Sequence, residues 1–447
     1  MTVKPHISNR KFKVVETILK SVTKVSDPAL AIRRHLSISG DNLKVNETIY
    51  KLNEYKNIYV VGGGKASAPM AVALEEMLGD RITSGIINVK YGYSLKTSKI
   101  EIVEAGHPIP DRNGLTGAKR MARLLDRAAE DDLVIALISG GASALIPLPV
   151  NGITLKDKKR VADLLLKSGA GIDEINIVRK HLSMIKGGQM AVMAYPAKVI
   201  SLILSDVIGD LMDIIASGPT VPDRSSYGDA KEVLVRYKLL DRIPEGVRSH
   251  LQKGMSGKVA ETPKRGHRAF KRVRNLIIGN NQIVVDEVER KAKEMGYDTL
   301  VLSRSIKGEA REVAKAFGSI ARVIRRSGAP VKRRICVIAG GETTVKVKGK
   351  GRGGRAQEFA LAAALEISGL EGVTMAGFAT DGTDGPTDAA GAIADGLTVD
   401  RAKRSGLDAG SLLDSNDSYN FFKSLGDLIV TGPTFTNLND LYLIFVD

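Results

Sequence analysis

The sequence predicts an α/β protein with two domains, each built from strands that alternate with helices. Short apolar runs rich in Val, Ile and Leu, four to eight residues long, alternate along the chain with stretches of helical periodicity. The length of 447 residues also suits two or three domains of ordinary size. Because strand and helix follow each other repeatedly, we expect crossover connections and a mostly parallel sheet covered on both faces.

The first half of the chain is expected to form one such sheet. Residues 8–55 read as mainly helical, with a break near Pro28. The β-branched runs predict strands at residues 58–61, 85–89, 100–103, 133–138 and 199–204. Helical periodicity between them predicts helices at residues 66–77, 116–129, 155–167 and 177–193.

A polar segment rich in Lys and Arg, residues 254–274, interrupts this alternation. Blocks of like charge rarely pack, so we expect a solvated linker, with a hinge that faces phosphate as the alternative. The predicted boundaries are an N-terminal domain at residues 1–255, a basic linker at 256–273 and a C-terminal domain at 274–447.

The alternation then resumes and predicts a second α/β domain. Strands are expected at residues 276–279, 299–302, 335–339, 343–347, 373–378, 428–430 and 442–445. Helices are expected at residues 282–295, 308–326 and 357–367.

Charge and composition limit the classes of partner. The 66 Lys and Arg residues exceed the 50 Asp and Glu residues, which gives a formal charge of +16 that attracts anions. Aromatic residues make up only 4% and Trp is absent, which argues against base-stacking surfaces and membrane belts. The single cysteine, Cys336, lies in an apolar run and is expected to be a buried thiol. With no apolar run of transmembrane length and no signal-peptide core, we expect a cytoplasmic protein.

The first candidate site is the turn Gly62-Gly63-Gly64-Lys65, which follows a predicted strand and precedes a helix. Glycine N–H groups and a lysine suit a phosphate, although a tight structural turn explains the glycines about as well. The spacing also half-matches a dinucleotide fingerprint. The next strand, however, ends at Lys90 rather than at the acid that would bind a ribose hydroxyl.

Two further turns follow predicted strands of the same domain. Ser139-Gly140-Gly141 offers hydroxyl and backbone donors for a phosphate or carboxylate, or serves only to stabilise a turn. Asp206 directly follows the strand at 199–204, where a carboxylate can bind magnesium or accept a proton.

Arg179 suits a substrate carboxylate, and a surface ion pair is the common alternative.

The C-terminal domain contributes a second set of candidates. Gly353-Gly354-Arg355 leads into a predicted helix, and an arginine at that position suits bidentate binding of phosphate. Asp381 and Asp384 lie in a Gly/Thr-rich loop after a strand. This loop lacks the terminal Glu of a calcium loop, so magnesium or Asx turns fit it better.

These segments together resemble one family, the class II glycerate 2-kinases, also called the MOFRL family. In matching order over nearly the whole chain, the segments are GGGKA (62–66), GHP (106–108), SGG (139–141), VRKHLS (178–183), SDV (205–207), SGPT (217–220), GGE (340–342), GGR (353–355) and TDGTDGP (380–386). The resemblance implies a larger Rossmann-like N-terminal domain, a smaller α/β C-terminal domain and an active site in the cleft between them.

The resemblance also implies ATP- and magnesium-dependent phosphorylation of D-glycerate to 2-phosphoglycerate. Lys65 matches the family's catalytic lysine and Arg355 its catalytic arginine; the family usually has Asn after that arginine, where this chain has Ala356. With Asp206, these two residues form the expected catalytic set. The other expected roles are substrate binding by Ser139, Gly140, Gly141 and Arg179, phosphate binding by Gly62, Gly63, Gly64, Gly353, Gly354 and Glu342, and metal binding by Asp206, Asp381 and Asp384.

The expected partners are the small molecules D-glycerate and ATP, without nucleic acid or membrane, and a homodimer is one candidate assembly. Two other functions remain as alternatives. An NAD(P)-dependent hydroxypyruvate reductase is suggested by the half-matched fingerprint, and a nucleic-acid-binding protein by the charge of +16.

Overall fold

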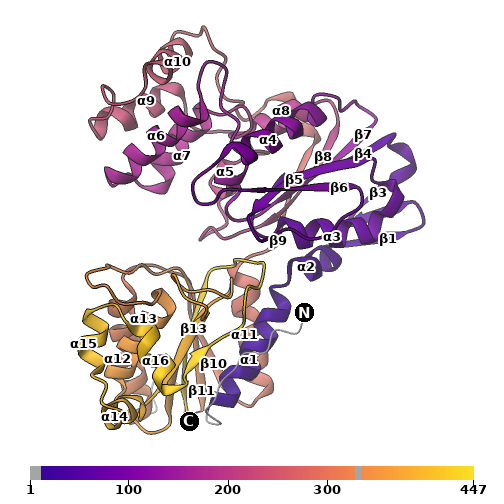
Figure 1. Cartoon of the computed structure of the whole chain (residues 1–447). Helices are drawn as coiled ribbons and strands as arrows, with labels where there is room; N and C mark the ends of the chain where they lie inside the picture. The colour runs from indigo at the N-terminus through magenta and orange to yellow at the C-terminus, as the bar shows by residue number, and fades with distance from the viewer. Residues whose placement is uncertain (1–11, 328–333) are drawn as a thin grey trace. The chain divides into compact units, whose positions relative to one another are not determined.

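A computed structural model of the chain describes residues 12–327 and 334–447 and divides into two compact units (Figure 1). The central unit is continuous, Pro28–Ile278. The terminal unit combines the segment that ends at Asp27 with Gly279–Asp447, so it is built from two stretches far apart in the sequence. Among the described residues, no helix is long and apolar enough to cross a membrane.

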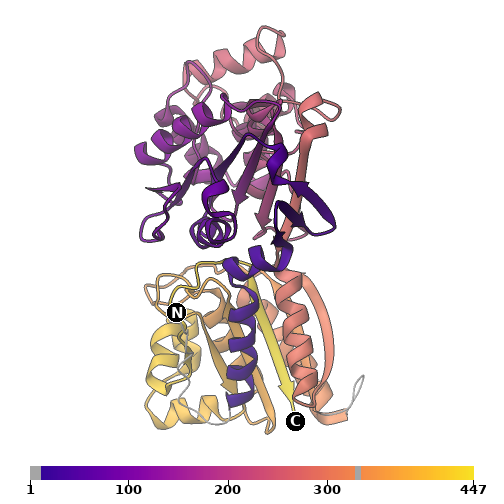
Figure 2. The same cartoon turned by 90° about the vertical axis from the view of Figure 1, so that its right-hand side faces the viewer.

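This division differs from the predicted boundaries at both ends. Helix α1, Lys13–Val25, packs against α11, Asn281–Glu294, within the terminal unit, and Figure 2 shows the two helices side by side. The apolar face of α1 is buried there, and Ser21 donates a hydrogen bond to Glu287. Residues 256–278, most of them expected to form a linker, belong to the central unit because their last part forms a strand of its sheet.

The central unit is built on a six-stranded sheet with the order β6-β5-β4-β7-β8-β9. Its β4–β5, β5–β6, β4–β7 and β7–β8 pairings are parallel, which confirms the predicted class of sheet. The strands are β4 (Asn57–Gly63), β5 (Ser84–Lys90), β6 (Ile100–Ala105), β7 (Asp132–Ile138), β8 (Lys198–Leu204) and β9 (Val273–Gly279). The run predicted as a strand of the second domain at 276–279 thus lies in β9.

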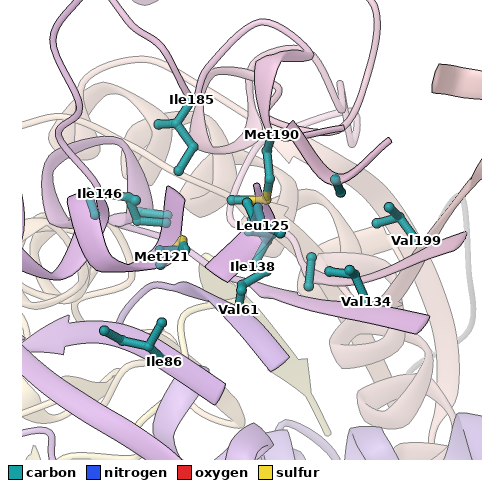
Figure 3. Close-up of a cluster of buried hydrophobic side chains, with 14 of the residues drawn as sticks. Val61, Ile86, Met121, Leu125, Val134, Ile138, Ile146, Ile185, Met190 and Val199 are labelled. Atoms are coloured by element: carbon teal, nitrogen blue, oxygen red, sulfur yellow. The ribbon is translucent and has the colours of Figure 1, made fainter. Parts of the chain in front are cut away.

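Helices pack against this sheet. In Figure 3, Met121 and Leu125 of α4 and Met190 of α8 pack against Val61 and Ile138 of the sheet. The helices nearest the sheet are α3 (Ser67–Leu78), α4 (Arg112–Leu125), α5 (Ala142–Leu145) and α8 (Gln189–Ala194). The predicted helix at 177–193 is two helices, because Gly187 and Gly188 adopt positive φ between α7 and α8.

Two smaller parts complete the central unit. The region 36–51, expected to be helical, is an antiparallel sheet of β1 (Leu36–Ser39), β2 (Asn42–Val45) and β3 (Thr48–Lys51). Burial alternates with the period of two that is typical of a strand, since Leu43 and Val45 are buried while their neighbours in β2 are exposed. A separate apolar cluster joins α6 (Leu155–Lys167), α7 (Ile172–His181), α9 (Tyr227–Arg236) and α10 (Glu245–Met255). Helix α2 is Pro28–His35.

The terminal unit has a mixed six-stranded sheet with the order β10-β11-β15-β12-β13-β14. Only the β10–β11 pair is parallel; the β11–β15, β12–β15, β12–β13 and β13–β14 pairs are antiparallel. The strands are β10 (Asp298–Ile306), β11 (Ile335–Gly341), β12 (Val373–Ala379), β13 (Gly391–Asp395), β14 (Leu428–Ile429) and β15 (Asp440–Val446). The strand predicted at 343–347 is absent, since Thr344 forms only an isolated bridge with Glu309.

The helices of the terminal unit bury this sheet. Phe359 of α13 packs on Phe317 of α12 and on Tyr442 of β15, with ring centroids 5.6 and 4.7 Å apart. Besides α1 and α11, the helices are α12 (Ala310–Ser327), α13 (Arg355–Glu366), α14 (Thr398–Arg404), α15 (Ala409–Asp414) and α16 (Ser418–Leu425).

Candidate active site

The glycines at the end of β4 allow two strand ends to pack closely. A β-carbon at Gly62, where φ is +137°, would lie 2.0 Å from the carbonyl oxygen of Leu137 in β7. A β-carbon at Gly64, where φ is +141°, would lie 2.1 Å from the Oγ of Ser139. Both the backbone conformation and the lack of space therefore require glycine.

The N–H groups of this turn bind other parts of the protein. The Gly64 N–H donates to a carbonyl of β5 at 3.0 Å, the Lys65 N–H to the carbonyl of Gly140 at 2.9 Å, and the Ala66 N–H to the Ser139 hydroxyl at 3.0 Å. The other two glycines of the turn lie inside β4, between β5 and β7. This differs from the predicted phosphate cradle: the turn joins strands, and the Lys65 side chain is the part suited to an anion.

Ser139 has the same structural role. Its side chain is buried, and its hydroxyl accepts the Ala66 N–H and lies 3.3 Å from the hydroxyl of Ser67. The predicted contact of Ser139 with a substrate carboxylate stays a prediction.

Three polar side chains meet around the turn that follows β7. A β-carbon at Gly141 would lie 2.9 Å from the His107 ring and 3.5 Å from Cγ of Lys65. A β-carbon at Gly140 would lie 2.1 Å from Oδ2 of Asp206. Lys65, His107 and Asp206 follow β4, β6 and β8, and the carboxyl ends of parallel strands share one edge of a sheet. The structure thus brings together Lys65, the two glycines and Asp206, as strand-end reasoning anticipates.

His107, part of the segment GHP at 106–108, is the member of this group that was not among the expected site residues. Burial, followed by the positive charges of Lys65 and Lys90, lowers its pKa to about 4. The imidazole is therefore neutral at neutral pH and is able to accept a proton or a hydrogen bond. Its signal in the sequence is the position directly after β6, at the same sheet edge as Lys65.

We expect Lys65→Met to raise the pKa of His107 toward 6.5, because the substitution removes the charge that contributes most after burial. NMR titration of the imidazole, assigned by its absence in His107→Gln, measures the shift. Lys90→Met is the matched control and should raise the pKa less. An unchanged midpoint in Lys65→Met would place the ammonium group away from the ring.

The same pKa shift makes the fold sensitive to acid. The folded protein holds His107 neutral down to a pKa of about 4, whereas an unfolded histidine takes up its proton near pH 6.5. Protonation therefore favours the unfolded chain as the pH falls from about 6.5 to about 4. In Lys65→Met this loss of stability should be smaller.

In the terminal unit, two carboxylates hold Arg355 at the start of α13. Its Nε and Nη2 donate to the two oxygens of Asp440 at 2.5 and 3.1 Å, and its Nη1 donates to Glu342 at 2.6 Å. Tyr442 donates to Asp440 at 3.1 Å, and Asn439 donates to Glu342 at 3.2 Å. The guanidinium is thus fixed in orientation. Glu342, expected to bind phosphate, binds Arg355.

Electrostatics keep this group charged in a buried setting. Burial opposes the charge of Arg355, but Asp440 and Glu342 outweigh burial and hold its pKa above the ordinary value. Burial raises the pKa of Asp440 to about 7, although Arg355 acts in the opposite direction. The Arg355 side chain still keeps 28% of its surface exposed, so part of it faces solvent.

Asp384 caps α13. Its carboxylate accepts the N–H groups of Ala356 at 3.2 Å and Gln357 at 2.8 Å, and the amide of the Gln357 side chain at 3.1 Å. It therefore takes the position at the helix N-terminus that an anion would take. This use differs from the predicted metal role of Asp384. Burial raises its pKa to about 6.

The glycine loop before α13 is packed rather than open. A β-carbon at Gly354 would lie 2.2 Å from Asp384 Oδ1, and one at Gly353 would lie 2.2 Å from Ser418 Oγ. Their absent side chains therefore allow this loop to approach neighbouring loops, which differs from a purely phosphate-binding role.

The metal candidates do not form a cluster. Asp381 accepts the N–H of Thr383 at 3.1 Å in an Asx turn, which is one of the two predicted alternatives for this loop. Among residues 12–327 and 334–447, no three His, Cys, Asp or Glu side chains are grouped so that they could hold a metal ion. Magnesium bound with a nucleotide needs only one or two protein carboxylates, and Asp206 is suited to that role.

Comparison with known proteins gives consistent matches over both units. Residues 14–252 match a domain of unknown function, DUF4147, and residues 335–440 match the MOFRL family. The chain is 42% identical over 424 residues to a glycerate 2-kinase of Pyrococcus horikoshii, covering 95% of this chain and 94% of that one. It is 45% identical over 400 residues to a D-glycerate 2-kinase of Thermotoga maritima, covering 89% and 93%. The crystal structure of glycerate kinase from Thermotoga maritima superposes with a TM-score of 0.86 at 41% identity, over 97% of this chain and 99% of that chain.

Proposed function

The chain belongs to the class II glycerate 2-kinase (MOFRL) family, and from this membership we infer that it is a kinase that phosphorylates the 2-hydroxyl group of glycerate. The geometric observation that supports this function is the meeting of Lys65, Asp206 and the Gly140-Gly141 turn at one edge of the central sheet. We propose ATP as the phosphoryl donor, D-glycerate as the acceptor, and the cytoplasm as its place of action.

Lys65 is proposed to neutralise charge on the transferring phosphoryl group. In phosphoryl transfer the protein mainly positions the reactants and stabilises charge that spreads over the phosphoryl oxygens. The Lys65 side chain begins beside Gly141, which has no side chain of its own there. The neighbouring His107 is neutral, so it adds no charge that would compete for the anion.

Asp206 is proposed either to accept the proton of the glycerate 2-hydroxyl or to bind magnesium. In the first role, the hydroxyl oxygen forms a bond to the γ-phosphorus, the bond to the β–γ bridging oxygen breaks, and the proton passes to the carboxylate. In the second role, the carboxylate would be one ligand of a magnesium ion that neutralises nucleotide phosphates. Asp381 remains an alternative ligand.

Arg355 is proposed to stabilise the same phosphoryl group during transfer. An arginine carries five N–H donors, and Asp440 and Glu342 accept three hydrogen bonds from it. Two donors are therefore left on a group whose direction is already fixed. Such preorganisation is what stabilisation of a transition state requires.

A dinucleotide-dependent reductase is less well supported by the central unit. β5 ends at Lys90, so the position of the ribose-binding acid holds a cation. The N–H group of Gly64, in the half-matched fingerprint, already binds a carbonyl of β5. Both features oppose the binding of a dinucleotide in the usual way.

The deciding assay incubates the protein with ATP, magnesium and D-glycerate and couples the product to enolase, with and without a phosphoglycerate mutase. We expect an enolase signal without the mutase, because enolase uses 2-phosphoglycerate directly. A signal that needs the mutase would contradict transfer to the 2-hydroxyl. Sustained oxidation of NADH or NADPH by hydroxypyruvate, with no ATP-dependent product, would favour the reductase.

A further inference from the structure

Three cations of the central unit gather without an acid to balance them. They are Lys158 on α6, Arg179 on α7 and Lys186 in the loop before α8. Each lies close enough to the other two, or to one of them, for their charges to repel. In the part of the chain that the structure describes, none of the three forms an ion pair with a carboxylate.

Lys186 of this basic cluster is buried, and Lys158 is half-buried with its ammonium nitrogen buried. The Nζ of Lys158 is inaccessible to solvent and has no hydrogen-bond partner within the described residues. Lys186 is 2% exposed, and its Nζ reaches only the carbonyl oxygen of Ile146 at 3.4 Å. Arg179 is partly exposed, so the cluster is open to solvent on the arginine's side.

Burial and mutual repulsion destabilise the protonated form of both lysines and so lower their pKa values. Burial and then the charge of Arg179 lower the pKa of Lys158 to about 7. Burial, followed by the charges of Lys158 and Arg179, holds the pKa of Lys186 well below its ordinary range. An unpaired buried charge is costly, and an anion in the cluster would remove most of that cost.

The cluster lies against the same short helix that borders the candidate active site. Lys186 donates to Ile146, which directly follows α5, and the Ile146 side chain contacts the end of β4 at Gly63. One turn before Arg179 on α7, Asn176 accepts from Ser217, whose hydroxyl lies 3.0 Å from that of Ser143 in α5. The first residue of α5 follows Gly141, the glycine beside Lys65 and His107.

We propose that Lys158, Arg179 and Lys186 form an oxyanion subsite that binds the carboxylate of glycerate. The proposal rests on the proposed kinase function. The sequence had suggested Arg179 for this role, whereas the two lysines emerge only from the structure. Phosphate offers the same chemistry, so inorganic phosphate is the competing occupant. Proton uptake accompanies binding, because the bound anion favours the ammonium form of Lys158 over its neutral amine.

Calorimetric titration of the ATP-free protein with D-glycerate tests the proposal. The titration is run at pH 8 in two buffers with different enthalpies of ionisation. We expect a net uptake of protons by the wild-type protein that is reduced in Lys158→Met. Lys158→Met should also bind D-glycerate at least tenfold more weakly, since one charge-assisted hydrogen bond is lost. The exposed Lys159→Met is the matched control and should match the wild type in both measurements.

Stability without ligand separates a binding role from a structural one. Lys158→Met removes a buried, repelled charge that has no partner, so the ligand-free variant should melt at the same temperature as the wild type or higher. A lysine needed only for folding would lower the melting temperature and leave the proton uptake unchanged, and that result would overturn the proposal.

Further outcomes show whether the carboxylate assignment, the subsite or the proposed kinase function is wrong. If inorganic phosphate causes proton uptake that depends on Lys158 while D-glycerate does not, the carboxylate assignment is overturned. In steady-state kinetics, Lys158→Met should raise the KM for D-glycerate and leave the KM for ATP unchanged; equal KM values for D-glycerate would refute the subsite alone. A wild-type protein that makes no 2-phosphoglycerate would instead refute the proposed function, whatever the calorimetry gives.

Discussion

Replacement of Arg355 by alanine should lower the kcat of glycerate phosphorylation about 10³-fold, the effect expected when an arginine that stabilises phosphoryl transfer is removed. The loss should fall on kcat because the guanidinium acts on charge that develops during transfer. Its two remaining donors are held in a fixed direction by Asp440 and Glu342. Initial rates at saturating ATP and D-glycerate measure the effect.

The fold should survive this substitution. The Asp440 carboxyl loses its partner, but its pKa is already raised to about 7 by burial, so it becomes neutral at little cost. Arg352→Ala is the matched control, because Arg352 lies in the same loop and is exposed over Tyr419. Arg355→Lys keeps the charge without the fork that spans two carboxylates, so it should recover only part of the rate. Near-normal turnover in Arg355→Ala would remove this residue from the mechanism.

Gly62→Ala should strongly destabilise the central unit. The new β-carbon would lie 2.0 Å from the carbonyl oxygen of Leu137, in backbone that cannot shift without breaking the β4–β7 pairing. Overpacking and a backbone conformation that favours glycine each cost about 1–3 kcal/mol, so we expect a loss of about 4 kcal/mol in the free energy of unfolding. Chemical denaturation followed by circular dichroism measures the loss.

Gly92→Ala measures the backbone strain alone, so the difference between the two variants gives the part of the loss that comes from the clash. Gly92 also has positive φ, +78°, but a β-carbon there meets no atom within 4 Å. Its replacement should cost about 1 kcal/mol, the strain of a left-handed conformation alone. Equal losses at the two positions would mean that the strand ends in the centre of the sheet can move apart.

Much of the fold class followed from local pattern, while the boundaries between units did not. Buried parallel strands are continuous apolar runs, and the runs at 133–138 and 199–204 lie within β7 and β8. The partner of α1 is α11, more than 250 residues later in the sequence, and no local signal pairs them. The antiparallel sheet at 36–51 was missed because its strands have four residues each, too short for a clear period.

Part of the candidate site was also predictable from the sequence, and part was not. Strand-end reasoning brought Lys65, Gly140, Gly141 and Asp206 to one sheet edge, because parallel strands fix where their carboxyl ends lie. The sequence did not indicate that Asp384 caps α13, because an aspartate in a loop has the same local pattern whether its carboxylate binds a metal or an N–H group. The basic cluster was equally hidden, because its three cations come from separate elements that only packing brings together.

The order of synthesis gives the discontinuous terminal unit a consequence for folding in the cell. Helix α1 is translated before the central unit, yet the helix that covers its apolar face is made only after the whole central unit has been translated. Val15, Ile18, Leu19 and Val22 therefore stay uncovered by α11 while residues 28–278 emerge and fold. During that interval α1 is a short amphipathic helix with an uncovered apolar face, and a nascent chain that ends before residue 281 lacks its partner helix.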